Sequence, residues 1–271
     1  MKIRQQEFDL KNKTHVMGIL NITPDSFYDG DNYYLPDKAL ARAEEMISQG
    51  VDIIDVGGMS TRPGHEEISI DEEQQRVIPV IEKIRKNFDI PISIDTYRSQ
   101  VAAEALKAGA DFVNDIWGAL YDDGQMAEII AENDVPCCLM HNSKSKAATV
   151  DEVLAGLKQS VDRALSYGVS PSNIIVDPGV GFAKIDQDLN LRVIRELSRF
   201  EELGYPILLG ASRKSLIGHV MDLPGQERLE GTLAITAYGY LSARLAFIRV
   251  HDVKENVRVL RMLDAVIQSG R

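Results

Sequence analysis

The sequence of 271 residues lacks several features that define whole classes of proteins. It has no run of about 20 apolar residues, so neither a membrane-spanning helix nor a membrane partner is expected. Residues 1–13 lack the apolar stretch of a secretory signal, which favours a cytoplasmic location. The 2 cysteines are adjacent, at Cys137 and Cys138, and no Cys/His spacing suits zinc. Neighbouring strand residues point to opposite faces, so no disulfide between the two is expected.

Basic residues are also scarce relative to acidic ones. The chain has 30 Lys and Arg against 41 Asp and Glu, which gives a formal net charge of −11. This balance argues against nucleic acid as a partner. It makes any local cluster of Arg and Lys informative, because an anionic ligand must be attracted against the overall negative field.

Short β-prone runs alternate with helical patterns along the whole chain. The runs predict strands at residues 16–20, 51–56, 90–94, 110–113, 135–140, 173–176, 205–209 and 245–250. Apolar periodicity between them predicts helices at 70–87 and 150–165, with Ser69 and Thr149 as N-caps in capping boxes. Gly109 is expected to end another helix.

This alternation predicts an α/β fold, a TIM (β/α)8 barrel in a single domain spanning residues 1–271. Eight units without a Gly-, Pro- or Ser-rich linker favour a closed barrel, and an open doubly wound sheet with extra strands is the alternative. In a barrel of this kind the chemistry gathers where the strands end and the following loops begin. The residues at those positions are therefore the candidates for a functional site.

Nearly every predicted strand finishes on a polar or charged residue. The set comprises Asn21, residues 57–64, Asp95, Asn114, Met140, His141, Asp177, Ser212, Arg213, Lys214, Arg249 and His251. Taken singly, each member has a structural explanation, with the aspartates as helix N-caps, the asparagine as a turn residue and His141 as a core histidine. Their convergence on one barrel mouth instead predicts a binding site.

Two groups within this set predict a ligand with two ends. An anionic, oxygen-rich end would be met by Arg62, Arg249, His251 and Asn21. A planar heterocycle with N–H donors would be met by Asp95, Asn114 and Asp177, since carboxylates accept paired N–H bonds well. No nucleophile–base pair and no metal cage is recognisable in the sequence. We therefore expect group transfer driven by positioning and by stabilisation of the leaving group.

Eight motifs, in order, resemble those of the dihydropteroate synthase family. They cover residues 17–253 and read NITPDSFYDG, DVGGMSTRPG, ISIDT, FVNDIWG, LMHN, VDPGVGFAK, LLGASRKSLIG and IRVHDV. The resemblance implies a TIM barrel that joins 6-hydroxymethyl-7,8-dihydropterin diphosphate to 4-aminobenzoate in folate biosynthesis. The products would be 7,8-dihydropteroate and pyrophosphate, with Mg²⁺ as cofactor. It also implies a homodimer, here through the apolar, small-residue segment 230–246, for which a buried barrel helix is the alternative interpretation.

The resemblance further implies a role for each matching residue. The pterin would be held by Asp95, Asn114, Asp177 and Lys214, with Met140 and Phe182 against its faces. The diphosphate would be bound by Arg249, His251, Asn21 and Thr61, with Asn21 on the Mg²⁺ side. The second substrate would be covered by two loops carrying Phe27, Arg62 and Pro63, and its carboxylate would be bound by Ser215. The catalytic roles would fall to Asp95, Lys214, Arg249 and His251.

Two other functions remain open on the sequence. A pterin-binding methyltransferase barrel acting on methyltetrahydrofolate would share the pterin carboxylates but would not need a diphosphate clamp. A catalytically silent pterin-binding homologue would be expected to lose loop residues first, whereas Asn21, Phe27, Arg62 and Lys214 are all present. Asp31 and Met59 depart from the residues usual in the two loops, which bears on loop closure.

Overall fold

Eight parallel strands close into a barrel, in the order β10-β3-β4-β5-β6-β7-β8-β9. The structure is a computed structural model that describes residues 1–23, 35–59, 67–143, 146–182 and 186–269. The barrel strands are His15–Asn21 (β3), Ile53–Gly57 (β4), Ile92–Asp95 (β5), Phe112–Asp115 (β6), Cys137–Met140 (β7), Ile174–Asp177 (β8), Ile207–Leu209 (β9) and Leu245–Val250 (β10). The predicted closed barrel is confirmed, and the predicted strand ends are correct to within about two residues.

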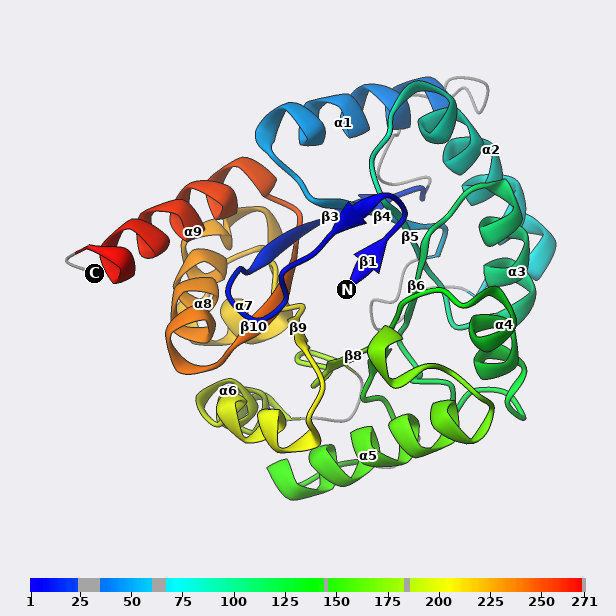
Figure 1. Ribbon diagram of the computed structural model, residues 1–271. Helices are drawn as coiled ribbons and strands as arrows, with labels where there is room; N and C mark the ends of the chain where they lie inside the picture. The colour runs from blue at the N-terminus through cyan, green and yellow to red at the C-terminus, as the bar shows by residue number, and fades with distance from the viewer. Residues whose placement is uncertain (24–34, 60–66, 144–145, 183–185, 270–271) are drawn as a thin grey trace.

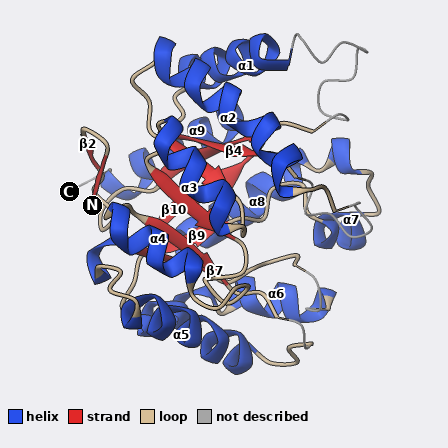
Figure 2. Cartoon of the chain, turned by 90° about the vertical axis from the view of Figure 1, so that its right-hand side faces the viewer, coloured by secondary structure: helices blue, strands red, loops and turns tan. Residues whose placement is uncertain are grey.

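Helices surround the barrel in the described part of the chain (Figure 1). They are Leu35–Gln49 (α1), Ile70–Asn87 (α2), Ser99–Ala108 (α3), Gln125–Asn133 (α4), Val150–Ser166 (α5), Gln187–Arg195 (α6), Ser215–Met221 (α7), Leu229–Ser242 (α8) and Val253–Gln268 (α9). Short 3-10 turns cover Pro171–Asn173 (η3), Leu197–Leu203 (η4) and Gly225–Glu227 (η5). Among the described helices, none combines the length and the apolar character needed to cross a bilayer. Figure 2 shows the strands enclosed by this layer of helices.

The two helices predicted from periodicity begin as their capping residues indicated. The Ser69 Oγ accepts a hydrogen bond from the backbone N–H of Glu72 at 3.1 Å, and α2 follows directly. The Thr149 Oγ1 accepts one from the backbone N–H of Glu152 at 3.2 Å, and α5 follows. Gly109 ends α3 with φ 112°, a left-handed conformation that suits glycine.

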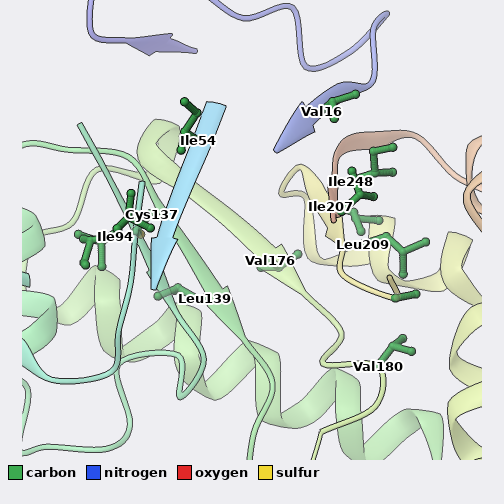
Figure 3. Packing of buried hydrophobic residues seen from close by; sticks show 14 of the residues in the cluster. Val16, Ile54, Ile94, Cys137, Leu139, Val176, Val180, Ile207, Leu209 and Ile248 are labelled. Atoms are coloured by element: carbon green, nitrogen blue, oxygen red, sulfur yellow. The ribbon is translucent and has the colours of Figure 1, made fainter. Parts of the chain in front are cut away.

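The strands present two different faces, because successive side chains alternate. One set of alternate residues, including Val16, Ile54 and Leu139, packs in a large apolar cluster with residues of the surrounding helices (Figure 3). The other set faces the barrel interior. Cys137 belongs to the first cluster and Cys138 to the interior cluster, and both are buried free thiols. The predicted opposite orientation of the two cysteines is therefore confirmed.

The end of the barrel at which the strands begin, called the lower end below, is closed by an N-terminal hairpin of Lys2–Ile3 (β1) and Gln6–Glu7 (β2). Figure 1 shows this hairpin lying across the middle of the ring of strands. Ile3 and Phe8 join the interior cluster, and the Phe8 ring lies 5.8 Å from that of Phe247. The members of this cluster from the barrel strands are Met17, Ile53, Phe112, Cys138, Ile175, Leu208, Ala246 and Phe247. The plugged end leaves the opposite, carboxyl end of the strands for a ligand.

Candidate functional site at the barrel mouth

The register of the strands brings the predicted strand-end residues to one level. Asn21 pairs with Gly57, Gly57 with Asp95, and Asp95 with Asn114, on four successive strands. On the far side of the ring Met140 pairs with Asp177. The predicted convergence of these polar groups on the barrel mouth is thus borne out by the strand pairing.

Two glycines leave space between the polar groups of the mouth. A Cβ at Gly57 would lie 3.5 Å from the Asp95 Oδ2 and 3.6 Å from the Asn21 Oδ1. A Cβ at Gly210, directly after β9, would lie 3.3 Å from the Asp177 Oδ2. Any larger side chain at either position would extend into the space beside these carboxylates. The two glycines therefore place no side chain against the Asp95 and Asp177 carboxylates.

Arg249 lies among the carboxylates on one side of the mouth. Its Nε donates to the Asp55 Oδ2 at 2.5 Å, and its Nη2 donates to the Asp95 Oδ2. Burial raises the pKa of Asp95 to about 7, although the Arg249 guanidinium opposes the rise. Burial disfavours the charge of Arg249 as well, but the two carboxylates outweigh this and hold its pKa above the usual value. Two buried carboxyl groups thus share one cation.

Asp55 is a residue of this site that sequence analysis missed. It lies inside β4, its side chain is 0% exposed, and its Oδ2 also accepts from the Asn114 Nδ2 at 3.1 Å. The signal that could have identified it was a carboxylate between apolar neighbours in the run IIDVG, residues 53–57. An aspartate in the middle of a buried strand requires a partner, and the partner here comes from a distant part of the chain.

On the other side of the mouth, Asp177 and Lys214 form an electrostatic pair. Burial raises the pKa of Asp177, while the Lys214 ammonium and the backbone N–H of Gly179, 2.8 Å from the Asp177 Oδ1, oppose the rise. Burial lowers the pKa of Lys214 to about 8 against the attraction of Asp177. The Lys214 Nζ donates to the Val180 carbonyl and lies 4.1 Å from the centre of the Phe182 ring. The ammonium is therefore held over an aromatic face at the rim.

An apolar wall completes the mouth. Met59, Tyr97, Ile116 and Met140 form a small buried cluster, against which Ile68, Trp117 and Phe182 pack. Both residues expected to contact the pterin faces, Met140 and Phe182, belong to this wall. Met59, one of the two departures from the family pattern, is 9% exposed and takes part in the same cluster. The site therefore combines an apolar surface with hydrogen-bond acceptors, as ligand sites commonly do.

The third part of the mouth follows β9 and β10. The Ser212 Oγ accepts from the His251 backbone N–H at 3.1 Å and lies 3.0 Å from the His251 Nδ1. Arg213 has φ 55°, and its Nε donates to the Asp252 Oδ2 at 2.9 Å, so its charge serves that ion pair. Ser215 is exposed and begins α7 directly after Lys214. His251 thus follows β10 and Ser215 begins α7 at the barrel mouth, their roles towards a ligand stay predictions, and Arg213 pairs with Asp252.

The structural explanations considered for single residues do not hold for the carboxylates. The N-cap of α3 is Arg98 and that of α6 is Asp186, so neither Asp95 nor Asp177 caps a described helix. Asn114 lies within β6 and not in a turn. His141 is 6% exposed and burial lowers its pKa, which fits the structural reading given to it.

Several predicted residues lie outside the described part of the chain. They are Phe27, Asp31, Thr61, Arg62 and Pro63, which fall in residues 24–34 and 60–66. Their expected roles in covering the second substrate and binding the diphosphate therefore stay predictions. Asn21, the residue expected on the metal side, is described at the end of β3 and is half-buried.

Among the described residues, no group of three His, Cys, Asp or Glu side chains is arranged to hold a metal ion. One oxygen donor at the mouth is the Asn21 amide oxygen. Mg²⁺ commonly keeps several waters and binds through one or two protein oxygens together with substrate phosphates. A single amide oxygen fits an ion that arrives with a diphosphate and does not fit one held in a protein cage.

Comparison with known proteins agrees with a pterin-binding barrel. Residues 17–251 match the family model described as pterin binding enzyme. The dihydropteroate synthase of Clostridium beijerinckii is 49% identical over 270 residues, covering 99% of this chain and 100% of the relative. A crystal structure of the Clostridium difficile dihydropteroate synthase in the presence of pteroic acid has a TM-score of 0.92 and 47% identity, covering 97% of this chain and 100% of that one. The Xanthomonas albilineans enzyme with 4-aminobenzoic acid has a TM-score of 0.90 and 34% identity, covering 95% and 94%.

Proposed function

The chain belongs to the pterin-binding enzymes and, within them, to the dihydropteroate synthases, and on this premise we propose how its own barrel mouth carries out their reaction. The reaction condenses 6-hydroxymethyl-7,8-dihydropterin diphosphate with 4-aminobenzoate to give 7,8-dihydropteroate and pyrophosphate. A methyltransferase acting on methyltetrahydrofolate is disfavoured, because the relatives matched over nearly the full length are synthases.

One observation carries the proposal, namely that acceptor groups from three strands lie at the barrel mouth beside an apolar wall. Asp95, Asn114 and Asp177 supply two carboxylates and an amide, and Gly57 and Gly210 place no side chain against the carboxylates. A pterin edge carries several N–H donors, which buried carboxylates accept in strong, charge-assisted bonds. Met140 and Phe182 would then cover the ring faces. Support for this ligand class comes from a relative crystallised in the presence of pteroic acid.

The chemistry follows from the placement of charge around the barrel mouth. The bond between the pterin methylene carbon and the diphosphate oxygen breaks, and the amine nitrogen of 4-aminobenzoate forms the new bond to that carbon. The amine then loses one proton, which leaves with the pyrophosphate. Asp95 lies on the ring side, where a carboxylate stabilises positive charge that develops on the pterin, and Arg249 and His251 stabilise the departing anion. The arylamine is neutral, so no strong base is needed.

We propose that Mg²⁺ binds at this mouth with Asn21 as its protein ligand. Mg²⁺ would supply Lewis-acid neutralisation of the diphosphate charge. The half-buried Asn21 amide at the end of β3 lies at the level of Asp95, and the Gly57 position between them has no side chain. Asn21→Ala should therefore raise the Mg²⁺ concentration needed for half-maximal turnover and leave binding of an unphosphorylated pterin unchanged.

The site for 4-aminobenzoate is proposed at the rim formed by Lys214 and Ser215. The Lys214 ammonium lies over the Phe182 ring, and the exposed Ser215 hydroxyl follows it in sequence. The hydroxyl would donate to the substrate carboxylate, and the Lys214 stem would pack on the aryl ring. Phe27, Arg62 and Pro63 would cover this substrate from two loops, as the resemblance implies. A relative crystallised with 4-aminobenzoic acid supports the substrate class.

The direct test is release of pyrophosphate by the purified protein mixed with the pterin diphosphate, 4-aminobenzoate and Mg²⁺. Pyrophosphate should appear in equal amount with dihydropteroate, and omission of the arylamine should stop both. Tight pterin binding without product would instead identify a catalytically silent homologue. Methyl transfer from methyltetrahydrofolate without pyrophosphate release would point to the methyltransferase alternative.

We also propose that the protein is a homodimer and works in the cytoplasm. Exposed apolar side chains gather on α7, α8 and α9, which Figure 1 shows next to one another, and they are Val220, Met221, Tyr238, Leu241, Met262, Val266 and Ile267. Leu241 is 65% and Met262 64% exposed, which is unusual for a surface without a partner. Leu241→Glu should shift sedimentation from dimer to monomer, whereas Tyr121→Glu, an exposed position elsewhere, should not. Two free thiols in the core suit a reducing compartment.

A further inference from the structure

Asp55 is a carboxylate buried below the mouth, on the same inward face of β4 as Gly57. Its side chain is 0% exposed, and one oxygen, Oδ2, accepts both from the Arg249 Nε at 2.5 Å and from the Asn114 Nδ2 at 3.1 Å. Its other oxygen, Oδ1, has no hydrogen-bond partner among the described residues. A buried ion pair is often no more stabilising than apolar side chains of the same volume. Stability alone therefore does not explain a carboxylate at this position.

We propose that Asp55 is a positioning residue for the condensation, which fixes the amide of Asn114 so that its oxygen faces the substrate ring and holds Arg249 in place beside it. This inference rests on the proposed function, because the ring that Asn114 meets is taken to be the pterin. Asp55 itself lies one layer below the residues that contact the ligand.

The orientation of the Asn114 amide is the first step of the argument. An asparagine amide offers an oxygen acceptor on one side and an NH2 donor on the other, and its partners decide which side faces where. An ionised Asp55 only accepts hydrogen bonds, so the Asn114 NH2 must turn towards it. The Asn114 oxygen is then left for the ligand. A ring edge with N–H donors is matched, and an edge with acceptors at that point is rejected.

The second step concerns Arg249. Its Nε is bound to Asp55 and its Nη2 to Asp95, so two edges of the planar guanidinium are fixed by carboxylates from neighbouring strands. Within the described residues no hydrogen bond engages the third nitrogen, Nη1. Without Asp55 the guanidinium would keep one anchor, Asp95, and could rotate about it. Asp55 thus links β4, β6 and β10 and orients two ligand-contacting side chains at once.

A double-mutant cycle on the full-length protein tests this inference. Binding of 6-hydroxymethylpterin is measured by calorimetry for the wild type, Asp55→Asn, Asn114→Asp and the double variant. Asp55→Asn should weaken binding about fivefold, and Asn114→Asp at least about fiftyfold, because two carboxylates then face each other without a donor. In the double variant the amide introduced by Asp55→Asn supplies the donor, and affinity should return to within about tenfold of the wild type. Asp55→Asn should thus lower pterin affinity when it is made alone and raise pterin affinity when it is added to Asn114→Asp.

Asp52→Asn is the matched control, because Asp52 precedes β4 at its opposite end and accepts from the Val16 backbone N–H at 2.8 Å. It should lower the melting temperature and leave pterin affinity unchanged. Independent effects of the two mutations, or wild-type affinity in Asp55→Asn, would overturn the inference. If Asn114→Asp does not fold, Asp55→Asn alone still tests the positioning role of Asp55, because a purely structural role predicts unchanged pterin affinity. A wild type that does not bind the pterin would refute the proposed function itself.

Discussion

The two ends of the barrel interior are built by the same strands and differ sharply in chemistry. At the lower end the inward residues are apolar, among them Met17, Phe112 and Phe247, and a hairpin covers them. Two positions further along the same strands, at the upper end, the inward residue is charged or polar. The pairs of inward residues, with the lower one first, are Ile53 and Asp55 on β4, Phe112 and Asn114 on β6, and Phe247 and Arg249 on β10. The comparison teaches two things. The alternation of residues along a strand determines which side chains face the barrel interior. The position of an inward side chain along the strand then determines whether it contributes to stability or to function.

The upper end lowers stability at neutral pH. Burial raises the pKa of Asp95 to about 7, so the folded chain holds a proton that the unfolded chain releases above about pH 4. The stability that this group contributes is therefore lost as the pH rises towards 7. At the lower end the interior cluster is built of apolar side chains, and the buried His15 ring lies against it, 4.7 Å from that of Phe8. A bound ligand that supplies N–H donors to the carboxylates of the mouth would offset the stability that the upper end loses.

Asp177→Asn should strongly reduce pterin affinity at the upper end and leave the stability of the lower end unchanged. The ring loses a charge-assisted acceptor, so pterin affinity should fall by at least about thirtyfold, equivalent to about 2 kcal/mol. Because burial raises the pKa of Asp177, the neutral amide should not lower the melting temperature. Calorimetry and a thermal scan on the same sample check both statements. Unchanged affinity would remove Asp177 from the site.

His251→Ala should separate the two ends of the ligand. The imidazole is assigned to the diphosphate, so affinity for the pterin diphosphate should fall about twentyfold while that for the bare hydroxymethylpterin stays constant. The Ser212 hydroxyl, which contacts the imidazole, provides the matched comparison. Ser212→Ala should produce the same selective loss in smaller measure. An equal loss for both ligands would assign His251 to the ring or to the fold.

Ser215→Ala should act on the second substrate alone. Loss of one hydrogen bond to a carboxylate should raise the apparent KM for 4-aminobenzoate about tenfold, equivalent to about 1.4 kcal/mol. The KM for the pterin diphosphate should not change. Since Lys214 contributes to both subsites, the pterin should bind first. Tight binding of 4-aminobenzoate to the ligand-free enzyme would contradict that order.

The pH dependence of pterin binding should reveal the charged groups of the mouth. Asp95, with a pKa of about 7, accepts best when ionised, so affinity should rise about fivefold between pH 6 and 7.5. Lys214, with a pKa of about 8, loses its charge above that value, so affinity should fall again in more alkaline solution. Calorimetry across pH 5.5 to 9.5, corrected for titration of the free pterin, measures the curve. A flat profile would contradict both assignments.

Much of this architecture was predictable, because its signals are local. The eight strand runs, the caps at Ser69 and Thr149 and the polar strand ends each depend on a few neighbouring residues. Asp55 was missed because its meaning depends on Arg249, which lies 194 residues away in the chain and meets it across the barrel interior. The pairing of Arg213 with Asp252 is equally non-local, since it depends on how the ends of two strands meet. The N-terminal hairpin was missed too, since its short strands carry little periodicity.

The most direct test of the contrast between the two ends uses two inward residues of β8, Ile175 and Asp177. Calorimetry with 6-hydroxymethylpterin and thermal scans are run in parallel on Ile175→Val and Asp177→Asn. Ile175→Val should lower the melting temperature by about 2 to 4 °C through a lost buried methylene, with unchanged pterin affinity. Asp177→Asn should lose the affinity and keep the melting temperature. The reverse pattern, with affinity lost in Ile175→Val and retained in Asp177→Asn, would contradict the assignment of the pterin site to the upper end.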